Sequence, residues 1–384
     1  MASGNEVRAP VREVTLLYFV PDSSDAKLFA RAAALTAAGY RLITIGFSRA
    51  RYETGQKIAW QHVDLGRIGD GNYASRIRRL IGGTKTAVLL VMQLRRGGGA
   101  TVLLARNLDM ALLALVSRRL GRTRAPLIYE VLDIRRVMTA KGPLGSTLRW
   151  LERRVLAAAR RLWISAPRFA SDYFAKVQNF EGAWRLIENK LVQVAPQAPD
   201  ALPTDRWVIG WFGTLRCARS LDILCSLAEA LGPKLEIHMR GYPARIGADQ
   251  FEAKIRPYPN IRYGGSYSPS DLPGMMAQVH FSWAFDYSDD WGNSRWLLPN
   301  RIYEAGYYER PSLADANHAT GCEVLDKDLG WAFSEDICDN LHAFLSEIDL
   351  PTWNTKRTAI AAKDKSCFYA PGDIVALVEE VLEQ

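Results

Sequence analysis

The sequence WVIGWFGTLRCARSLD at residues 207–222 joins an apolar stretch to an amphipathic one through a glycine-containing turn. The apolar start has the composition of a buried strand, and the residues at 220–231 repeat apolar side chains with a helical period. Gly213 lets an anion approach the backbone closely, and Thr214 and Arg216 follow it near the helix N-terminus. The segment predicts a strand, a phosphate-binding turn and a helix, although an ordinary strand-to-helix turn also uses glycine.

Short runs rich in Val, Ile and Leu alternate with longer helical segments on both sides of this unit. Before it, we predict strands at 14–20, 41–47, 86–92, 101–105 and 126–132 and helices at 25–38, 72–82, 108–120 and 145–161. After it, we predict strands at 234–240, 261–263, 279–284 and 311–314 and helices at 270–277 and 299–307. The alternation is typical of parallel sheets covered by helices on both faces. Because 384 residues exceed one ordinary core, we predict an α/β chain of two Rossmann-like domains.

The centre of the chain contains several prolines. We predict that the polar, helix-breaking segment 196–206 is the linker between the domains. The domains are then residues 1–195 and 207–370, and residues 371–384 form a closing helix.

The positive charge is concentrated in the first part of the chain. Residues 1–200 carry 32 Lys and Arg against 15 Asp and Glu, whereas the remaining residues carry 17 against 26. Such a division favours a polyanionic partner for the first domain, either phospholipid headgroups or nucleic acid. The basic helices at 72–82 and 145–161 could rest on an anionic membrane, or they are ordinary helices with a solvated face.

The five cysteines form no CxxC pair and show no zinc-finger spacing with histidine, which favours a reducing cytoplasm. The start of the chain lacks the pattern of a signal peptide. Every apolar run is interrupted before it reaches the ~18 residues of a membrane span. We therefore predict a cytoplasmic protein that associates peripherally with the inner face of the cytoplasmic membrane.

A second constellation is RWLLPNRIYEAGYYERP at residues 295–311. The proline favours a helix start just before Asn300, and Arg301 and Glu304 then share one face of the helix. Arginine can clamp a phosphate through two parallel hydrogen bonds, and a carboxylate can accept hydrogen bonds from two ribose hydroxyls. The pair predicts a nucleotide diphosphate site, with an intrahelical ion pair as the alternative.

Several segments together resemble a known family. They are ENK at 188–190, IGWFGTLR at 209–216, HMRGYP at 238–243, NIRYGGSYSPSDLP at 260–273 and LPNRIYEAGYYERPSLA at 298–314, with weaker likeness in EVLD at 130–133 and LERRVLAAARRLWISAPRF at 151–169. This series resembles the GT-B glycosyltransferases related to family 4, and bacterial exopolysaccharide enzymes of the succinoglycan type in particular. The resemblance implies two Rossmann-like domains that face each other across a cleft.

The resemblance also implies roles for residues of the second domain. Gly213, Thr214 and Arg216 would approach the diphosphate of a nucleotide sugar, Gly241, Tyr242, Pro243 and Tyr267 would border the base, and Glu304 would meet the ribose. Asn300 and Arg301 open the same helix, where Arg301 offers a further phosphate contact. Trp296 stands where these enzymes usually carry a second glutamate, so the family does not decide the stereochemistry.

The loop at 285–296 is predicted to cover the donor sugar through Asp286, Asn293 and Ser294. The pair Asp289 and Asp290 resembles a metal site but is interpreted as part of this loop. We predict no metal and no cofactor beyond the nucleotide-sugar substrate.

The sequence is compatible with two mechanisms of sugar transfer. If the anomeric centre inverts, a carboxylate must take the acceptor proton, and Asp133 is the first candidate and Asp22 the second. If configuration is retained, no base is required, and Arg216 and Arg301 stabilise the departing diphosphate.

The predicted function is transfer of a sugar from a UDP- or GDP-linked donor to a lipid-linked oligosaccharide. One alternative is a nucleic-acid-binding protein that uses the basic domain, but the sequence has no zinc finger or RNA-binding aromatic motif, so we predict no nucleic-acid partner. A second alternative is an epimerase or a noncatalytic homologue, because a fold does not fix a function.

Overall fold

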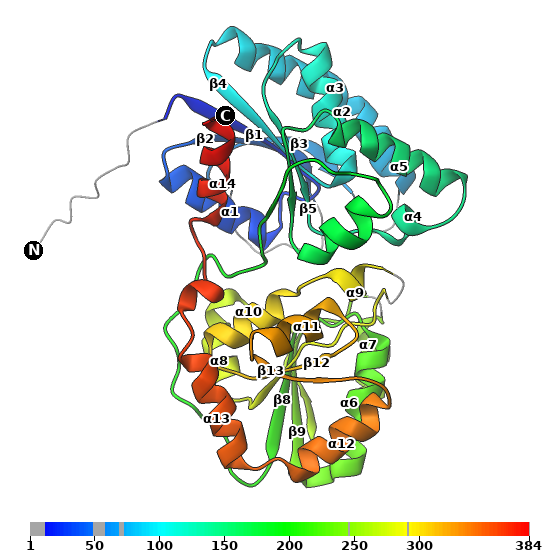
Figure 1. Ribbon diagram of the computed structural model, residues 1–384, viewed down its shortest axis with the longest axis vertical. Helices are drawn as coiled ribbons and strands as arrows, with labels where there is room; N and C mark the ends of the chain where they lie inside the picture. Colours follow the sequence, from blue (N-terminus) through cyan, green and yellow to red (C-terminus); the bar gives the residue numbers. More distant parts are fainter. Residues whose placement is uncertain (1–11, 49–57, 69–72, 245, 290–291, 384) are drawn as a thin grey trace, which may run out of the picture. The chain divides into compact units, whose positions relative to one another are not determined.

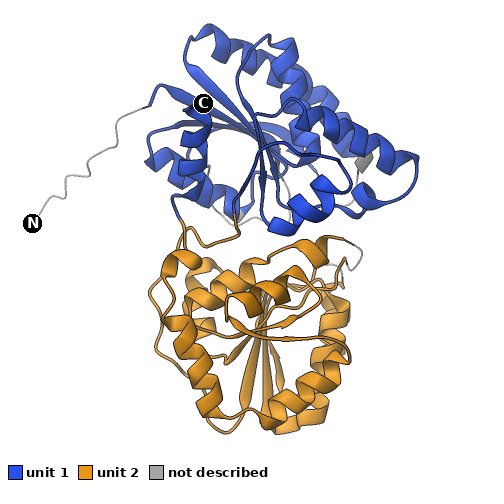
Figure 2. Ribbon diagram, in the orientation of Figure 1, with its two compact units in different colours: residues 1–187, 371–384 blue, residues 188–370 orange. Residues whose placement is uncertain are grey.

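The computed structural model describes residues 12–48, 58–68, 73–244, 246–289 and 292–383 (Figure 1). The chain divides into two compact units (Figure 2): residues 1–187 with 371–384 form unit 1, and residues 188–370 form unit 2. Each unit contains a parallel sheet with helices on both faces (Figure 1). The predicted pair of Rossmann-like domains is confirmed.

Unit 1 is built on a seven-stranded sheet in the order β3-β2-β1-β4-β5-β6-β7. Its strands are β1 Val14–Val20, β2 Arg41–Ser48, β3 Gln61–Arg67, β4 Ala100–Arg106, β5 Leu127–Val131, β6 Arg161–Ile164 and β7 Trp184–Leu186. Strands β1 and β5 are buried over nearly their whole length because helices cover both faces, which explains their continuous apolar runs.

The helices of unit 1 form two layers. They are α1 Ala26–Ala37, α2 Tyr73–Arg96, α3 Asn107–Leu120, α4 Arg136–Thr139, α5 Pro143–Leu156, the π-helical segment Phe169–Ala175 and α14 Asp373–Leu382. Helices α1 and α14 pack against each other, whereas α2, α3 and α5 are neighbours in the other layer (Figure 1). Ile374, Val378 and Val381 of α14 share one core with Leu28 and Leu35 of α1, so the end of the chain belongs to the first unit.

Unit 2 repeats the plan with a six-stranded sheet in the order β10-β9-β8-β11-β12-β13. Its strands are β8 Trp207–Thr214, β9 Leu235–Tyr242, β10 Ile261–Tyr263, β11 Phe281–Trp283, β12 Ser312–Asp315 and β13 Gly330–Phe333. Its α-helices are α6 Ala218–Leu231, α7 Ala248–Ile255, α8 Leu272–Met276, α9 Asn293–Trp296, α10 Asn300–Tyr307, α11 Ala319–Asp326, α12 Ile337–Glu347 and α13 Leu350–Ala361. Short 3-10 segments lie at Gly232–Lys234, Pro269–Asp271 and Lys365–Cys367.

Both sheets reverse their strand order beside their first strand. Strand β1 lies between β2 and β4, and β8 lies between β9 and β11. In α/β proteins the loops that follow two such strands diverge to opposite faces, and ligands usually bind between them at the carboxyl ends of the strands. The turn at Gly213 and the loop that begins after β11 therefore lie at the same point of unit 2.

One predicted strand of unit 1 was wrong, and one predicted helix ends earlier than expected. Residues 86–92, predicted as a strand, lie inside α2. Ala87 and Val91 are buried while Leu89 is 54% exposed, so the apolar run is a helix in which only one face packs. The helix predicted at 145–161 ends at Leu156, and Arg161 already begins β6.

The chain crosses from unit 1 to unit 2 between Ile187 and Glu188, before the linker predicted at 196–206. That segment is held within unit 2, because Asp200 forms ion pairs with Arg310 and Arg357. Its polar, proline-rich composition thus belongs to a surface segment of unit 2 that is tied down by charge. The predicted closing helix at 371–384 corresponds to α14, which lies in unit 1.

Candidate functional site

Strands β8 and β9 each carry a glycine with positive φ beside their last residue, and the two glycines pair. Gly213 has φ +109° and pairs with Gly241 of β9, which has φ +134°. A Cβ atom on Gly241 would lie 1.7 Å from the carbonyl oxygen of Gly213, so only glycine fits there. A Cβ atom on Gly213 would meet nothing within 4 Å, and Thr214 beside it is exposed. The turn leaves room in front of Gly213, as a backbone that approaches a ligand requires.

Arg216 follows this turn and contacts the loop after β11. Its Nη2 atom donates to Oδ2 of Asp286 at 2.8 Å. The other carboxylate oxygen of Asp286 accepts from the backbone N–H of Ser288 at 2.8 Å and from Oγ of Ser294 at 3.3 Å. Burial opposes ionisation of Asp286, but Arg216, Arg301 and the Ser288 hydroxyl together hold its pKa well below the usual range.

Arg301 lies on the first turn of α10, and its Nη1 atom donates to the carbonyl oxygen of Trp283 at 3.0 Å. Burial lowers the pKa of Arg301, Asp286 raises it and Arg216 lowers it again. The two guanidiniums are therefore near enough to repel each other, and both are attracted to Asp286. Two positive charges around one negative charge leave a local excess that suits an anion.

Glu304 and Tyr267 lie in the same neighbourhood. Burial and the charge of Glu304 both raise the pKa of the Tyr267 phenol, while Arg301 and Arg240 lower it. Arg240 is fastened to the loop that carries Tyr267 by a 3.0 Å hydrogen bond from its Nη2 atom to the carbonyl oxygen of Ser266. The carboxylate of Glu304, the ring of Tyr267 and the guanidinium of Arg301 thus lie near one another at the start of α10.

The other predicted donor-site residues differ in exposure. Pro243 is buried, whereas the ring of Tyr242 is half exposed at the carboxyl end of β9. Asn293 and Ser294 are buried at the start of α9, where the Ser294 hydroxyl accepts from the backbone N–H of Asp289 at 2.9 Å. Asn300 is exposed on the first turn of α10. The neighbouring Asp290 lies outside the described residues.

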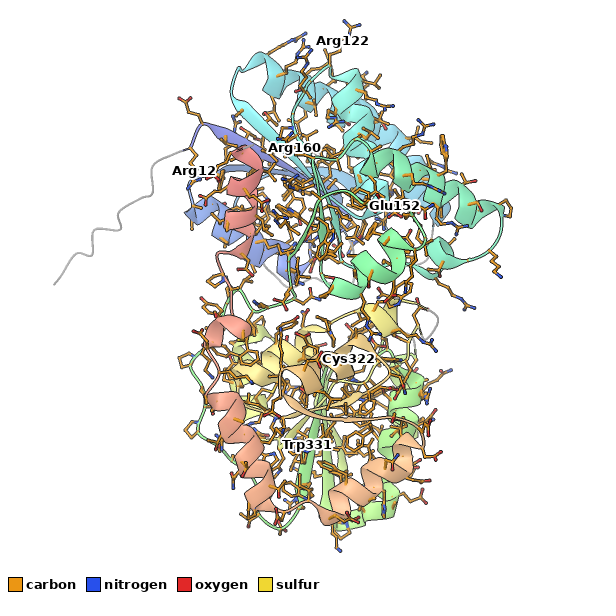
Figure 3. The ribbon with its side chains drawn as sticks, in the orientation of Figure 1. Arg12, Arg122, Glu152, Arg160, Cys322 and Trp331 are labelled. Carbon is orange, nitrogen blue, oxygen red and sulfur yellow. The ribbon has the colours of Figure 1, made fainter. Side chains whose placement is uncertain are left out.

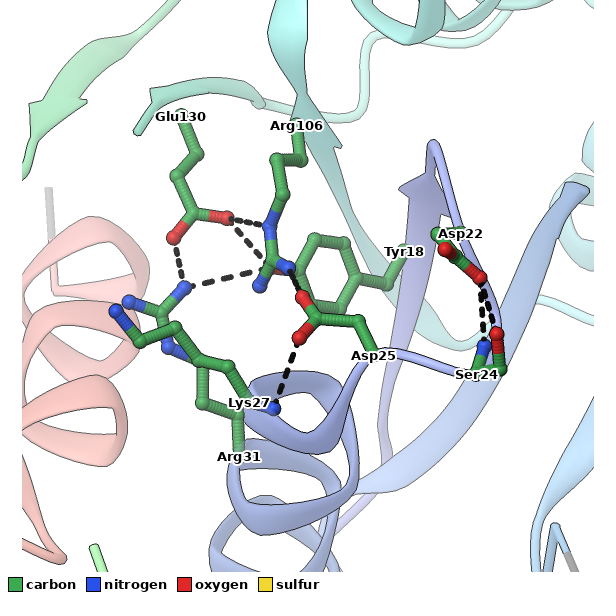
Figure 4. Close-up of polar contacts among 8 residues, drawn as sticks. All are labelled: Tyr18, Asp22, Ser24, Asp25, Lys27, Arg31, Arg106 and Glu130. Atoms are coloured by element: carbon green, nitrogen blue, oxygen red, sulfur yellow. Dashed lines mark hydrogen bonds and ion pairs between the residues drawn. The ribbon is translucent and has the colours of Figure 1, made fainter. Parts of the chain in front are cut away.

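The two predicted base candidates lie in unit 1 at the carboxyl ends of strands. Asp22 follows β1, is buried, and its Oδ1 atom accepts from the backbone N–H of Ser24 at 2.9 Å and from the Ser24 hydroxyl at 2.6 Å (Figure 4). Asp133 follows β5 and is exposed. Asp133 acts electrostatically on Lys27, because its charge raises the pKa of that ammonium group.

Unit 1 also contains a buried polar cluster that the sequence interpretation missed. Glu130 of β5 forms ion pairs with Arg31 and, at 3.0 Å, with Nε of Arg106 (Figure 4). The Tyr18 hydroxyl donates to Glu130 at 2.5 Å, and Arg106 also reaches Asp25, the N-cap of α1. The available signal was a lone charge inside an apolar strand, Glu130 in the run LIYEV.

Burial lowers the pKa of the Lys27 ammonium from 10.5 to about 7, with a further lowering by Arg31 and Arg106. Asp25 and Asp133 act in the opposite direction. Cations and carboxylates are therefore concentrated together at the carboxyl ends of β1, β4 and β5.

The structure brings Arg216, Asp286, Ser294 and Arg301 together in unit 2, and it places Glu304 near Tyr267. The sequence interpretation did not include the supporting contacts from Ser288 and the Trp283 carbonyl. Among the described residues, no group of three or more His, Cys, Asp or Glu side chains is placed to hold a metal ion. No helix in the described part of the chain has both the length and the apolarity to cross a membrane.

Comparison with known proteins places this chain in a family. Succinoglycan biosynthesis protein ExoL of Rhizobium meliloti (strain 1021) is 34% identical over 308 residues, which cover 78% of this chain and 76% of that protein. The chain belongs to the ExoL family. No family model matches the chain.

Solved structures of glycosyltransferases share the fold of this ExoL-family protein. Sucrose-phosphate synthase from Thermosynechococcus elongatus has a TM-score of 0.70 at 14% identity, covering 96% of this chain and 98% of that one. HepE from Anabaena, in complex with UDP and glucose, has a TM-score of 0.66 at 14% identity, covering 96% and 99%. The predicted GT-B fold and the resemblance to succinoglycan-type exopolysaccharide proteins are confirmed.

Proposed function

We propose that this ExoL-family protein transfers a sugar from a nucleoside diphosphate sugar, UDP- or GDP-linked, to a lipid-linked glycan acceptor in the synthesis of an exopolysaccharide or another cell-surface glycan. Arg216 and Arg301 lie around Asp286 at the strand-order reversal of unit 2, and this placement supports the binding of a nucleotide-sugar donor. HepE, which has a similar fold, has structures with UDP and with UDP-glucose. The ExoL relative is named for succinoglycan biosynthesis, which supports a role in the synthesis of an exopolysaccharide.

In this proposal the donor diphosphate lies against Gly213 and Thr214, and Arg216 and Arg301 donate hydrogen bonds to it. The open space in front of Gly213 supports close approach of the phosphate to the backbone. Glu304 accepts from the ribose hydroxyls, and Tyr267 and the exposed ring of Tyr242 border the base. Asp286 positions Arg216, and Ser294 supports that carboxylate in turn.

Two routes for the chemistry follow from these residues. In a retaining reaction, Arg216 and Arg301 stabilise the charge that develops on the departing diphosphate, and no protein base is required. In an inverting reaction, a carboxylate accepts the proton of the acceptor hydroxyl. Asp133 fits that role better than Asp22, because Asp133 is exposed whereas Asp22 is buried and bonded to Ser24.

The lipid part of the acceptor requires the enzyme to work at a membrane. Ile81 on α2 is 71% exposed and Trp150 on α5 is 52% exposed, and the guanidinium of Arg154 lies 5.0 Å from the Trp150 ring centroid. Exposed apolar side chains beside arginines suit the interface of an anionic bilayer. We call the exposed faces of α2 and α5 the membrane face, and we propose peripheral binding to the inner leaflet of the cytoplasmic membrane.

A donor screen tests the proposal. Purified protein is incubated with common UDP- and GDP-sugars and a polyprenyl-diphosphate-linked glycan, and released nucleoside diphosphate is measured. One donor is expected to release diphosphate only when the lipid-linked acceptor is present. Failure of every donor and acceptor pair, with a protein whose circular dichroism shows it folded, would contradict the proposed transfer.

A further inference from the structure

A pocket of about 530 Å³ lies in unit 1 at the amino-terminal edge of the sheet. It is formed where β4 begins and where the chain enters β5 and β6, so it lies at the sheet edge opposite to Asp22 and Asp133. Its volume falls within the range of ~300–1,000 Å³ that is typical of small-molecule sites. The proposed donor and acceptor chemistry makes no use of it.

Three arginines line this pocket: Arg118 at the end of α3, Arg124 before β5 and Arg160 before β6. Figure 3 labels Arg160 on unit 1. Arg118 donates from Nη1 to the carbonyl oxygen of Ala158 at 3.0 Å, which fastens the segment that leads to Arg160. Within the described ranges, no ion pair joins any of these three side chains to a carboxylate, and the lining itself contains no Asp or Glu.

The nearest acidic helix does not neutralise these arginines. Helix α14 contributes Val381 and Leu382 to the pocket, but its Glu380 pairs with Arg161 and Arg185 and its Glu379 pairs with Arg12. Arg118 sits at the C-terminus of a helix, where a cation is favoured by the macrodipole. Arg124 and Arg160 lie in connecting segments outside α3 and α5, so that explanation does not apply to them.

Apart from Thr101, the rest of the lining consists of small or apolar side chains. Pro126, Ala158, Ala159 and Leu382 contribute short or apolar side chains, which leave space between the guanidinium groups. Burial and the like charge of Arg119 lower the pKa of Arg118, a repulsion that a bound anion would relieve. Several guanidiniums lining one pocket beside apolar walls offer the chemistry that recognises a phosphate carried on an organic group.

We propose that this pocket is a phosphate-binding site of unit 1, occupied by the phosphate of an anionic lipid headgroup or of a soluble phosphorylated compound. Arg118, Arg124 and Arg160 would each donate to the phosphate oxygens. Phosphate binding to this pocket can be measured without an assay of sugar transfer, so the two proposals can fail separately.

The test compares two double variants of the full chain. Arg124→Gln with Arg160→Gln removes two charges from the pocket, and Arg41→Gln with Arg256→Gln removes two exposed charges elsewhere. Inorganic pyrophosphate is titrated by calorimetry into each. The donor site can also bind pyrophosphate, but its contribution is the same in both variants, so their difference reports the pocket alone.

The pocket variant is expected to bind pyrophosphate at least ~10-fold more weakly at one site, while the control stays within about twofold of the native chain. Equal weakening in both variants, or none in either, overturns the proposal. Arg124→Lys with Arg160→Lys keeps the charge but loses the planar fork, so an intermediate loss is expected. Melting temperatures of all variants identify any that fail to fold.

Vesicles identify the source of the phosphate. The same proteins are floated with phosphatidylglycerol vesicles and with phosphatidylcholine vesicles. If the pocket variant loses phosphatidylglycerol binding beyond the control, the ligand is a lipid headgroup. If only pyrophosphate binding falls, the ligand is a soluble phosphate compound, and both results support the site.

Discussion

Asp286 accepts a hydrogen bond from Arg216 and lies within electrostatic reach of Arg301, so one carboxylate serves two guanidiniums. Replacing Arg301 by glutamine leaves a neutral Arg216–Asp286 pair and removes the excess charge that we assign to the diphosphate. Arg301→Gln is therefore expected to weaken UDP or GDP binding ~10- to 100-fold, the range of a lost charge-assisted hydrogen bond or two. Calorimetric titration of each nucleotide measures the change.

Arg295→Gln provides the matched control for this prediction. Arg295 lies on α9, is exposed, and carries the same charge. Its substitution is expected to change nucleotide affinity less than about twofold. Similar losses in Arg295→Gln and Arg301→Gln would mean that overall charge, and not the placement of Arg301 beside Asp286, controls binding.

Lys27 gives unit 1 a pH dependence. Its pKa is lowered from 10.5 to about 7 by burial and by two arginines, so the unfolded chain binds the proton more tightly than the folded one. The contribution of Lys27 to the free energy of unfolding therefore rises with pH between about 7 and about 10.5. Lys27→Met is expected to stabilise the protein most at and below about pH 7, with a gain that shrinks as the pH rises towards about 10.5.

Urea unfolding at about pH 7 and about pH 9.5 measures the gain, because the linkage slope acts between those values. Lys141→Met is the control, since Lys141 is exposed in the same unit and its stability change is expected to be small at both pH values. A Lys27→Met gain of equal size at both pH values would show that the ammonium group does not titrate in this window.

At the scale of elements, the pairing of β8 with β9 depends on the contact between Gly213 and Gly241. Gly241→Ala places a Cβ atom 1.7 Å from a backbone oxygen, so the two strand ends must separate. The expected cost is about 1–3 kcal/mol beyond the ~1–2 kcal/mol of strain at positive φ. Gly247→Ala is the control, because Gly247 has φ +86° and a Cβ there meets nothing within 4 Å.

Urea denaturation compares the two glycine variants. Gly241→Ala is expected to lower the free energy of unfolding clearly more than Gly247→Ala and to weaken nucleotide binding as well, because the turn at Gly213 moves with the strand. Equal losses of stability would show that strain alone, and not the close approach of the backbones, requires glycine at position 241.

The sequence predicted an element well where the period of its apolar residues matches the face that is buried. Strand β1 and helix α6 read correctly because their apolar patterns match their covered faces. Strand β3 was missed because QHVDLGR is only partly buried and polar, and residues 86–92 were misread because a continuous apolar run fits a helix as well as a strand. The Arg216–Asp286 pair joins positions 70 apart, so no local pattern could reveal it.

At the scale of the whole molecule, the chain enters unit 2 once and returns to unit 1 in α14. The sequence indicated a last amphipathic helix but not its destination, because the apolar residues of α14 fit any uncovered face. The core shared by α14 and α1 makes the last residues part of the basic unit. The boundary of unit 1 at residue 187 lies near the end of the basic part of the sequence. Helix α14 adds acidic residues to unit 1, but its basic residues remain in excess, which supports a polyanionic surface as the partner of unit 1.

Substitutions on the membrane face distinguish a membrane from nucleic acid as the polyanionic partner of unit 1. Ile81→Ser with Trp150→Ser removes exposed apolar area but no charge, so it is expected to weaken flotation with phosphatidylglycerol vesicles roughly 10-fold. Leu325→Ser on α11 of unit 2, where the leucine is 53% exposed, is expected to float like the native chain. Nucleic acid would bind through the arginines alone, so a duplex DNA shift that both variants retain, together with unchanged flotation, would contradict the membrane assignment.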